Sequence, residues 1–458
     1  MFADFSVKTS LREIKIAKLY LFFLPFRMIM PLVWMQDFIG PLANSFDLVF
    51  HIYGLLLWSS NEGGFFYSAS NRSLFGTIKG SIVLLNLSSM FMSIVMFTSY
   101  GNLHGASPFF AIIPMMLFYF QYLFMFLYNI RVFSILDYGT IVKQIKKSCR
   151  VLLCLAYIQI AVMMGIGGGL YDAIVSVIGG FNTSDRLPKL CLTVSEGAAA
   201  GSLMGVFVFP FLFGRYIHGD KKAQWELLLW LIPLYFTHSS TAMILFFCCF
   251  LVFLFEVTKK GSSLAFKLTG LGILSATFGL ILMYTGVLGD EVLEDINYLL
   301  FEKATDQENG STISRQVPLI INWGCFTEMP LLGVGNGLQG YFYNKYFPME
   351  FLSIAGSDVG EFYEIAQTGI ANGGCFWPGY LSGYGILGLL VLFNLVTKLI
   401  KQRKLRCQNL GLFNEMFIMG AICFIPLGMQ GEAYSLYYAW FVLAIPFMYF
   451  QKEELENA

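Results

Sequence analysis

Two arginines stand out because the segments around them carry few other positive charges. Arg186 comes ten residues before Glu196, which leads into the small-residue run 197–201. Arg315 follows the hydroxyl-rich stretch 311–314. A guanidinium group binds phosphate oxygens through two parallel hydrogen bonds and keeps its charge when partly desolvated. These residue types indicate a site for a phosphate-bearing group, although Arg186 could instead extend toward lipid headgroups.

A second group of candidate residues follows Arg315 on the same segment. Glu328 comes shortly before Gly333, Gly335 and Asn336, which form a glycine-rich string. Glycine permits left-handed backbone and close approach to a ligand. The string lacks the strand, turn and helix of a dinucleotide-binding fold, so we reject that interpretation. We predict that these four residues contact substrate, with the orienting of an arginine as the simpler role for Glu328.

A short polar segment interrupts two apolar stretches at 237–241, and it includes His238 and Ser239. Because lipid satisfies no hydrogen bonds, such a segment needs protein or substrate partners. It either lines a substrate site or bonds to backbone carbonyls across a tight helical turn. No His, Cys or acidic residues have metal-ligand spacing, and the acidic run 290–295 reads as a solvated helix face. We expect no metal and no cofactor.

The composition predicts a membrane protein. Hydrophobic residues make up 57% of the 458 residues, and charged residues make up 13%, whereas soluble domains carry roughly 25% charged residues. The formal net charge is zero, and no run of like charges suggests nucleic-acid binding. The elements that position the candidate residues are therefore expected to be apolar helices.

About twelve segments are long and apolar enough to cross a bilayer, which takes roughly 20 residues in a helix. The sequence therefore predicts an all-α polytopic membrane protein with one large exported loop between spans 9 and 10. The predicted spans are 17–36, 38–58, 80–100, 108–130, 151–170, 197–214, 224–238, 239–257, 268–288, 376–397, 411–430 and 433–450.

These spans divide the chain into five parts. Residues 1–170 hold spans 1 to 5, and 171–196 form a short exported loop. Spans 6 to 9 occupy 197–288, and the large exported loop occupies 289–375. The last three spans and a cytoplasmic tail occupy 376–458. Because a loop as long as 289–375 is uncommon without a purpose, we expect it to fold and to carry function.

The basic residues set the expected orientation, because Lys and Arg stay on the cytoplasmic side of short loops. Alternating spans from a cytoplasmic start place both termini and most basic loops inside. Arg27 falls within the first predicted span, where it could pair with Asp47. The basic residues that this orientation places outside are Arg186, Lys189, Lys303, Arg315 and Lys345.

Four stretches resemble motifs of one family of membrane enzymes. They are Arg186–Gly201, Thr237–Ala242, the run from Arg315 through Trp323, Glu328–Pro330 and Gly333–Gly335, and Asn372 followed by Tyr384–Gly388. In this arrangement the chain resembles the O-antigen polymerase (Wzy) family, within the wider O-antigen polymerase and ligase superfamily. The similarity covers roughly residues 184–390.

The resemblance implies an enzyme of the bacterial inner membrane that polymerises undecaprenyl-pyrophosphate-linked oligosaccharides at the periplasmic face. It implies that Arg186 and Arg315 stabilise the pyrophosphate leaving group, and that Glu196 or Glu328 accepts a proton or orients an arginine. Asn372 joins the substrate-binding residues on the same ground. Membrane lipid and a chain-length-determining co-polymerase are the further partners it implies.

Two alternatives remain open. Ligases of the superfamily carry a histidine in the large loop near its return to the membrane, and 371–375 contains none, which favours a polymerase. A lipid-linked oligosaccharide flippase or transporter would more often place charges along the centre of the bundle. The predicted spans contain few such charges, with Arg27, Asp47 and Glu432 as the notable exceptions.

Overall fold

All regular elements in the part of the chain that the computed structural model describes are helices. The described residues are 10–26, 49–50, 52–53, 56, 69–102, 107–166, 190, 192, 197–259, 310–347, 376–430, 437–450 and 455. The helices are α1 (Leu11–Phe23), α5 (Ala69–Tyr100), α6 (Pro108–Ala111), α7 (Ile113–Ile135), α8 (Tyr138–Met163), α10 (Gly197–Leu203), the π-helical turn η2 (Met204–Val208), α11 (Phe209–Ile217), α12 (Lys222–Phe236), α13 (Ser240–Lys259), α16 (Gly310–Glu328), η4 (Gln339–Phe342), α17 (Tyr343–Tyr346), α20 (Phe376–Arg406), η6 (Cys407–Asn409), α21 (Phe413–Gln430), α22 (Tyr437–Ala444) and η8 (Ile445–Phe447).

Five helical stretches are long and apolar enough to cross a membrane, and each overlaps a predicted span. They are Arg72–Tyr100, Pro108–Ile135, Ala198–Ile217, Ser240–Val257 and Phe376–Asn409. Two shorter apolar helices, Phe413–Met429 and Tyr438–Phe447, coincide with the last two predicted spans. The helical membrane fold is therefore supported, while the total of twelve spans stays a prediction. The span predicted at 268–288 and most of 38–58 lie outside the described residues.

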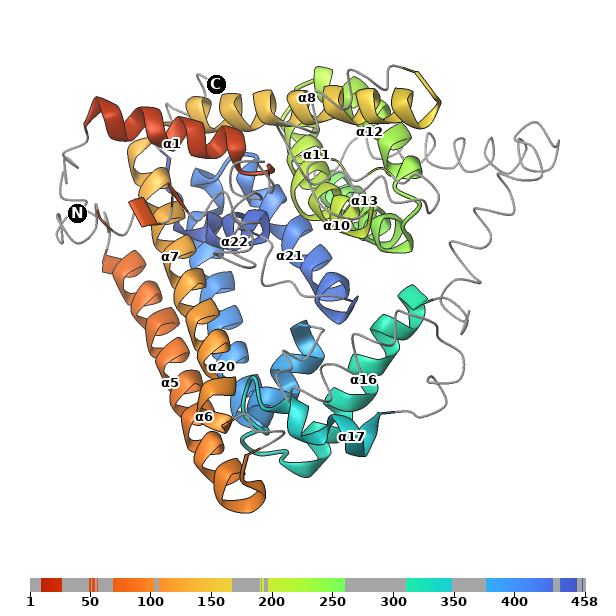
Figure 1. The fold of residues 1–458 in the computed structure, drawn as a ribbon. Coiled ribbons are helices and arrows are strands. Elements are labelled where there is room, and N and C mark those ends of the chain that lie inside the picture. The colour runs from red at the N-terminus through yellow and green to blue at the C-terminus, as the bar shows by residue number, and fades with distance from the viewer. Residues whose placement is uncertain are drawn as a thin grey trace.

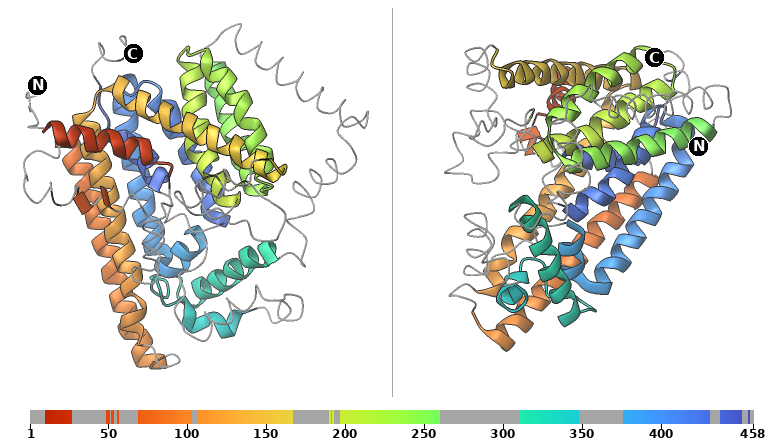
Figure 2. Two further views of the ribbon diagram at one scale, coloured as in Figure 1. Left: turned by 45° about the horizontal axis from the view of Figure 1, so that its top comes forward. Right: turned by 90° about the vertical axis from the view of Figure 1, so that its right-hand side faces the viewer.

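Helix α8 begins in a predicted basic loop and continues without interruption into the span predicted at 151–170. Asp137 caps its start, because the Asp137 carboxylate accepts a hydrogen bond of 2.6 Å from the backbone N–H of Thr140. Helices α1 and α8 pack against each other. Both run across one end of the long helices α5, α7 and α20 (Figures 1 and 2). The basic residues of these two helices therefore gather at that end.

Helices α16 and α17 lie at the opposite end of the long helices, away from α1 and α8 (Figure 1). Helix α16 packs against α20 there. Helices α16 and α17 belong to the predicted exported loop 289–375, of which the structure describes 310–347. The hydroxyl of Tyr341 donates a hydrogen bond of 3.0 Å to the carbonyl of Gly101, just beyond α5. Residues 310–347 are therefore folded and packed against the long helices, while the exported loop itself stays a prediction.

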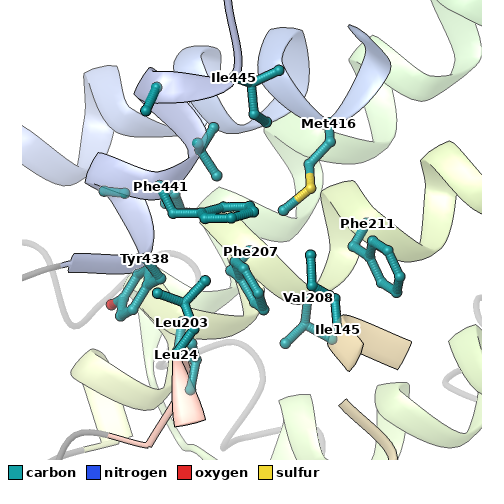
Figure 3. Packing of buried hydrophobic residues seen from close by; sticks show 14 of the residues in the cluster. Leu24, Ile145, Leu203, Phe207, Val208, Phe211, Met416, Tyr438, Phe441 and Ile445 are labelled. Carbon is teal, nitrogen blue, oxygen red and sulfur yellow. The ribbon is translucent and has the colours of Figure 1, made fainter. Parts of the chain in front are cut away.

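The main hydrophobic core surrounds η2, where α11, α21 and α22 meet (Figure 3). Phe207, Phe211, Met416, Phe441 and Ile445 are fully buried there. The widened π turn ends just before Pro210, which lacks the N–H that a regular α-helical hydrogen bond would need. The core thus keeps a local irregularity where apolar side chains cover it on several sides.

Two glycines allow α10 and η2 to pack closely on α13. A Cβ added at Gly201 would collide with Ala242, and one added at Gly205 would collide with Leu245. Glycines four residues apart lie on one helix face and let two backbones approach each other, as is typical of membrane helices. The small-residue run 197–201 therefore has a packing role.

Candidate functional site

Helix α20 is broken at Gly385, where φ is 58° and ψ is −147°. In a regular helix the carbonyls of Ser382 and Gly383 would accept hydrogen bonds from Ile386 and Leu387. The break at Gly385 separates these donors from these acceptors. In an apolar helix such groups need other partners, since lipid supplies none.

The segment after α16 supplies those partners. Its backbone N–H groups at Val334 and Gly335 donate to the carbonyls of Ser382 and Gly383, at 2.8 and 3.0 Å. Its carbonyls at Pro330 and Leu331 accept hydrogen bonds from Ile386 and Leu387, also at 2.8 and 3.0 Å. All four groups freed by the break are therefore satisfied by residues 330–335, which we call the docking turn.

The predicted glycines give the docking turn its shape. Gly333 and Gly335 adopt φ values of 70° and 94°, so the left-handed backbone that the sequence permits there is confirmed. A Cβ added at Gly333 would collide with the backbone of Gly383 and Tyr384. The glycines thus let two main chains touch, and a role in substrate binding stays a prediction.

A buried network of neutral side chains supports the docking turn. The hydroxyl of Ser382 donates to Asn322 Oδ1 at 2.6 Å, and Gln339 Nε2 donates to Ser382 Oγ at 3.3 Å. Gln339 Oε1 accepts from the backbone N–H of Gly337 at 2.9 Å. The backbone N–H of Asn336, a residue with 3% exposure, donates a hydrogen bond of 3.2 Å to Ser89 Oγ on α5. We call Ser89, Asn322, Asn336, Gln339 and Ser382 the neutral network.

Asn336, a predicted substrate-binding residue, is therefore held inside the protein. Its side chain also hydrogen-bonds with that of Tyr384 on α20. Since amides and hydroxyls carry no charge and have partners here, this network fixes positions and does not supply acid–base chemistry. It positions the end of α16, which carries the charged candidates.

Glu328 ends α16 and lies at the surface beside α17. Its carboxylate accepts hydrogen bonds from Lys345 Nζ and from the hydroxyl of Tyr346. These two bonds and the positive charge of Lys345 lower the pKa of Glu328 below its ordinary value. A carboxylate with a lowered pKa is a weaker base, so the geometry favours a positioning role for Glu328. Among the described side chains, the cation that Glu328 contacts is Lys345 and not an arginine.

Arg315 lies in the first half of α16, and its backbone is helical. It precedes Glu328 by 13 residues, which separates the two by about 20 Å along a helix that rises 1.5 Å per residue. The structure does not bring Glu328 next to the position of Arg315. Arg186, Glu196 and Asn372 lie outside the described residues, so their predicted roles stay predictions.

His238 and Ser239 lie at the junction of α12 and α13. His238 has a left-handed φ of 44°, which is unusual for a residue other than glycine. Ser239 Oγ accepts a hydrogen bond of 3.4 Å from the backbone N–H of Ala242 at the start of α13. The hydroxyl of Thr237 donates to the carbonyl of Leu234 at 2.7 Å. These local bonds match the helical-turn interpretation of the polar segment.

Two described residues of the predicted loop 171–196, Leu190 and Leu192, contact described helices. The backbone N–H of Leu190 donates to the carbonyl of Phe236 at 2.8 Å. Gln159 of α8 holds Leu192 through two hydrogen bonds, of 2.9 and 3.0 Å. Leu190 is therefore held next to Phe236 and Leu192 next to Gln159.

Several residues of this region are not identified by the sequence. Gln339, Asn322 and Ser382 are isolated polar residues whose partners are distant in the chain. A usable signal exists at 382–385, where serine, tyrosine and two glycines interrupt an apolar run. Among the described residues no three His, Cys, Asp or Glu side chains come together as metal ligands.

The chain matches no protein-family model, and it matches no curated protein sequence. The resemblance carried by Arg186–Gly201, Thr237–Ala242, the run from Arg315 to Gly335, and the stretch from Asn372 to Gly388 therefore stays a prediction.

Proposed function

We propose that this protein is a membrane-embedded glycosyltransferase of the O-antigen polymerase type. It joins undecaprenyl-pyrophosphate-linked oligosaccharide units into a surface polysaccharide at the periplasmic face of the bacterial inner membrane. Both chain termini lie in the cytoplasm. The growing glycan leaves its lipid carrier and passes to a newly arrived lipid-linked unit.

The observation that carries the proposal is the attachment of α16 to the break in α20. Residues 330–335 fasten the end of α16 to a helix long and apolar enough to cross the membrane. This attachment lies at the end of the long helices away from the basic α1 and α8 (Figure 1). A rigid element at that level, carrying Arg315, suits an enzyme whose lipid-linked substrate lies at the membrane surface.

The reaction forms one bond and breaks one. A hydroxyl oxygen of the acceptor sugar attacks the anomeric carbon of the donor glycan. The bond from that carbon to the pyrophosphate oxygen breaks, and the electron pair leaves with undecaprenyl pyrophosphate. Arg186 and Arg315 neutralise the charge that develops on the leaving group, as preorganised cations do.

Glu196 is the proposed proton acceptor. Glu328 is disfavoured for this role because it lies about 20 Å from Arg315 along α16 and is held by Lys345 and Tyr346. His238 and Ser239 border the acceptor side, next to the loop that carries Arg186. Asn372 completes the proposed substrate surface, which the buried glycines Gly333 and Gly335 support by fastening α16 to α20.

Extension of a defined lipid-linked unit by the purified protein tests the proposal. The parent should lengthen the unit without any lipid A core acceptor. Arg315→Lys should lower the rate of polymer formation roughly 100-fold, which is about what the loss of one hydrogen-bond donor to a transition state costs. The ammonium group of lysine is a point charge and does not reproduce the two parallel hydrogen bonds of a guanidinium group. Lys303→Gln is the control, since it removes another cation of the same loop.

The outcomes separate the alternatives. Product that forms only with a core acceptor identifies a ligase. Movement of the lipid-linked unit across the bilayer without a new glycosidic bond identifies a flippase. Parental activity in both Arg186→Ala and Arg315→Ala would overturn the assigned site.

A further inference from the structure

The outer face of α8 combines cations with an apolar surface. A groove of about 430 Å³ runs along it, which we call the α8 groove. Lys143, Lys147 and Arg150 are exposed and follow an i, i+4, i+7 spacing that places them on one side of the helix. The residues that line the groove are Lys143, Lys146, Lys147, Arg150, Val151, Cys154 and Leu155.

The charges around the α8 groove are unbalanced. Lys146 pairs with Asp220 at 3.0 Å, and Arg150 pairs with Glu226 at 2.7 Å. Both carboxylates are shared with Arg215 of α11. Among the described residues, three cations therefore share these two carboxylates, and the groove is lined by two further lysines, Lys143 and Lys147.

The neighbouring helix α1 adds positive charge. It packs against α8 and carries Arg12, Lys15 and Lys18. Lys147 Nζ lies 5.4 Å from the centroid of the Phe22 ring, near the end of α1. The region is thus complementary to an anion, and clustered lysines and arginines attract anionic headgroups.

The second half of the groove distinguishes a lipid from a soluble anion. Val151, Cys154 and Leu155 continue the basic face one turn further along α8 and are apolar. Helix α8 also runs across the end of the long apolar helices (Figures 1 and 2), where headgroups of a surrounding bilayer would lie. We propose that the α8 groove binds an anionic phospholipid, with the phosphate at Lys143 and Lys147 and the start of an acyl chain against Val151 and Leu155.

Cys154 offers a direct measurement, because it lines the groove and is exposed. The full chain is placed in nanodiscs of phosphatidylcholine, with or without phosphatidylglycerol, and the alkylation rate of each cysteine is read by peptide mass spectrometry. Phosphatidylglycerol should slow alkylation of Cys154 several-fold. The exposed Cys407 should not be slowed in this way.

Cys407 is a control for surface charge. It lies in η6, and the neighbouring Leu412 donates a backbone hydrogen bond of 3.3 Å to the hydroxyl of Tyr138, the first residue of α8. Both cysteines therefore face the same end of the fold. Equal slowing at Cys154 and Cys407 would overturn the proposal, since it would reflect surface charge alone.

Two further arms complete the test. The double variant Lys143→Gln/Lys147→Gln should abolish the protection of Cys154, whereas Lys401→Gln, at an exposed lysine of α20, should retain it. Inorganic phosphate in phosphatidylcholine nanodiscs should not protect Cys154. Protection by phosphate, or protection that persists in the double variant, would overturn the lipid assignment. None of these readouts depends on glycosyl transfer.

Discussion

The two ends of the fold are held by polar networks that differ in charge. At the α8 end, Arg215 binds Asp220 and Glu226, which in turn bind Lys146 and Arg150. We call these five residues the charged network. At the other end, the neutral network joins α16 and the docking turn to α20 and α5. In the charged network the side-chain exposure ranges from 2% at Arg215 to 52% at Arg150, whereas the residues of the neutral network are almost completely buried.

The difference follows from the free energy of desolvation. A buried charge is costly unless it is paired, and contact with solvent reduces that cost. Amides and hydroxyls can be fully buried when each donor has an acceptor. The charged network therefore suits the end rich in basic residues, and the neutral network suits the place where a helix is broken within apolar surroundings.

The largest expected effect belongs to the docking turn. Gly333→Ala should lower the free energy of unfolding by about 3–5 kcal/mol, since a left-handed alanine and an overpacked contact both cost stability. The added Cβ meets backbone atoms of α20, which have little room to move. Thermal unfolding in detergent measures the loss.

Gly101→Ala is the matched control for the turn. Gly101 has a φ of 71°, and nothing lies within 4 Å of an added Cβ. It should lose about 1–2 kcal/mol, the cost of the left-handed backbone alone. Equal losses in the two variants would show that contact between the docking turn and α20 contributes nothing.

The next largest effect is expected in the charged network. Arg215→Ala leaves two carboxylates without their buried partner and should cost about 3 kcal/mol. Arg215→Lys should recover part of this, because it restores the charge but contacts one carboxylate at a time. Chemical unfolding of both variants measures the difference. A lysine variant as unstable as the alanine variant would show that the shape of the guanidinium, and not its charge, is what matters.

Removal of one hydroxyl tests the neutral network. Ser382→Ala removes the partner that Asn322 and Gln339 share and should cost about 1–3 kcal/mol. Ser93→Ala is the control, because the buried Ser93 hydroxyl bonds only locally, to the carbonyl of Met90 at 2.7 Å. The melting temperature of Ser382→Ala should be the lower of the two. The reverse order would contradict a supporting role for the network.

The smallest effect is a dependence on pH at Asp220. Partial burial opposes its ionisation, but hydrogen bonds and charge from Arg215 and Lys146 outweigh this and lower its pKa to about 2. An unfolded aspartate has a pKa of about 3.9. The Asp220 carboxylate therefore stabilises the fold above about pH 4, and this contribution is lost as the pH falls toward about 2.

Asp220→Asn checks this dependence. The variant should be less stable than the parent near pH 6, and the gap should narrow as the pH falls below about 4. Melting temperatures across this range measure the gap. A gap that stays constant down to about pH 2 would contradict an ionised Asp220 as the source of the stability.

The candidate site was predictable where the type of a single residue decides which backbone conformations are allowed. The glycines at 333 and 335 permit a left-handed turn, and the structure has one there. The partner of Glu328 was not predictable, because Lys345 is 17 residues away in the chain and the spacing does not decide which of Lys303, Arg315 and Lys345 meets this carboxylate. The bonds of Ser382 with Asn322, 60 residues away, are equally invisible in sequence.

The sequence by itself determined that the chain forms apolar helices and that few of its basic residues fall within 289–375. Both follow from composition along the chain, since lipid accepts only backbone that satisfies its own hydrogen bonds. Only the tertiary structure decided that α20 breaks at Gly385 and that residues 330–335 repair the break. A glycine in an apolar helix is compatible with either state, and the choice depends on whether a second segment arrives to bond with the freed backbone groups.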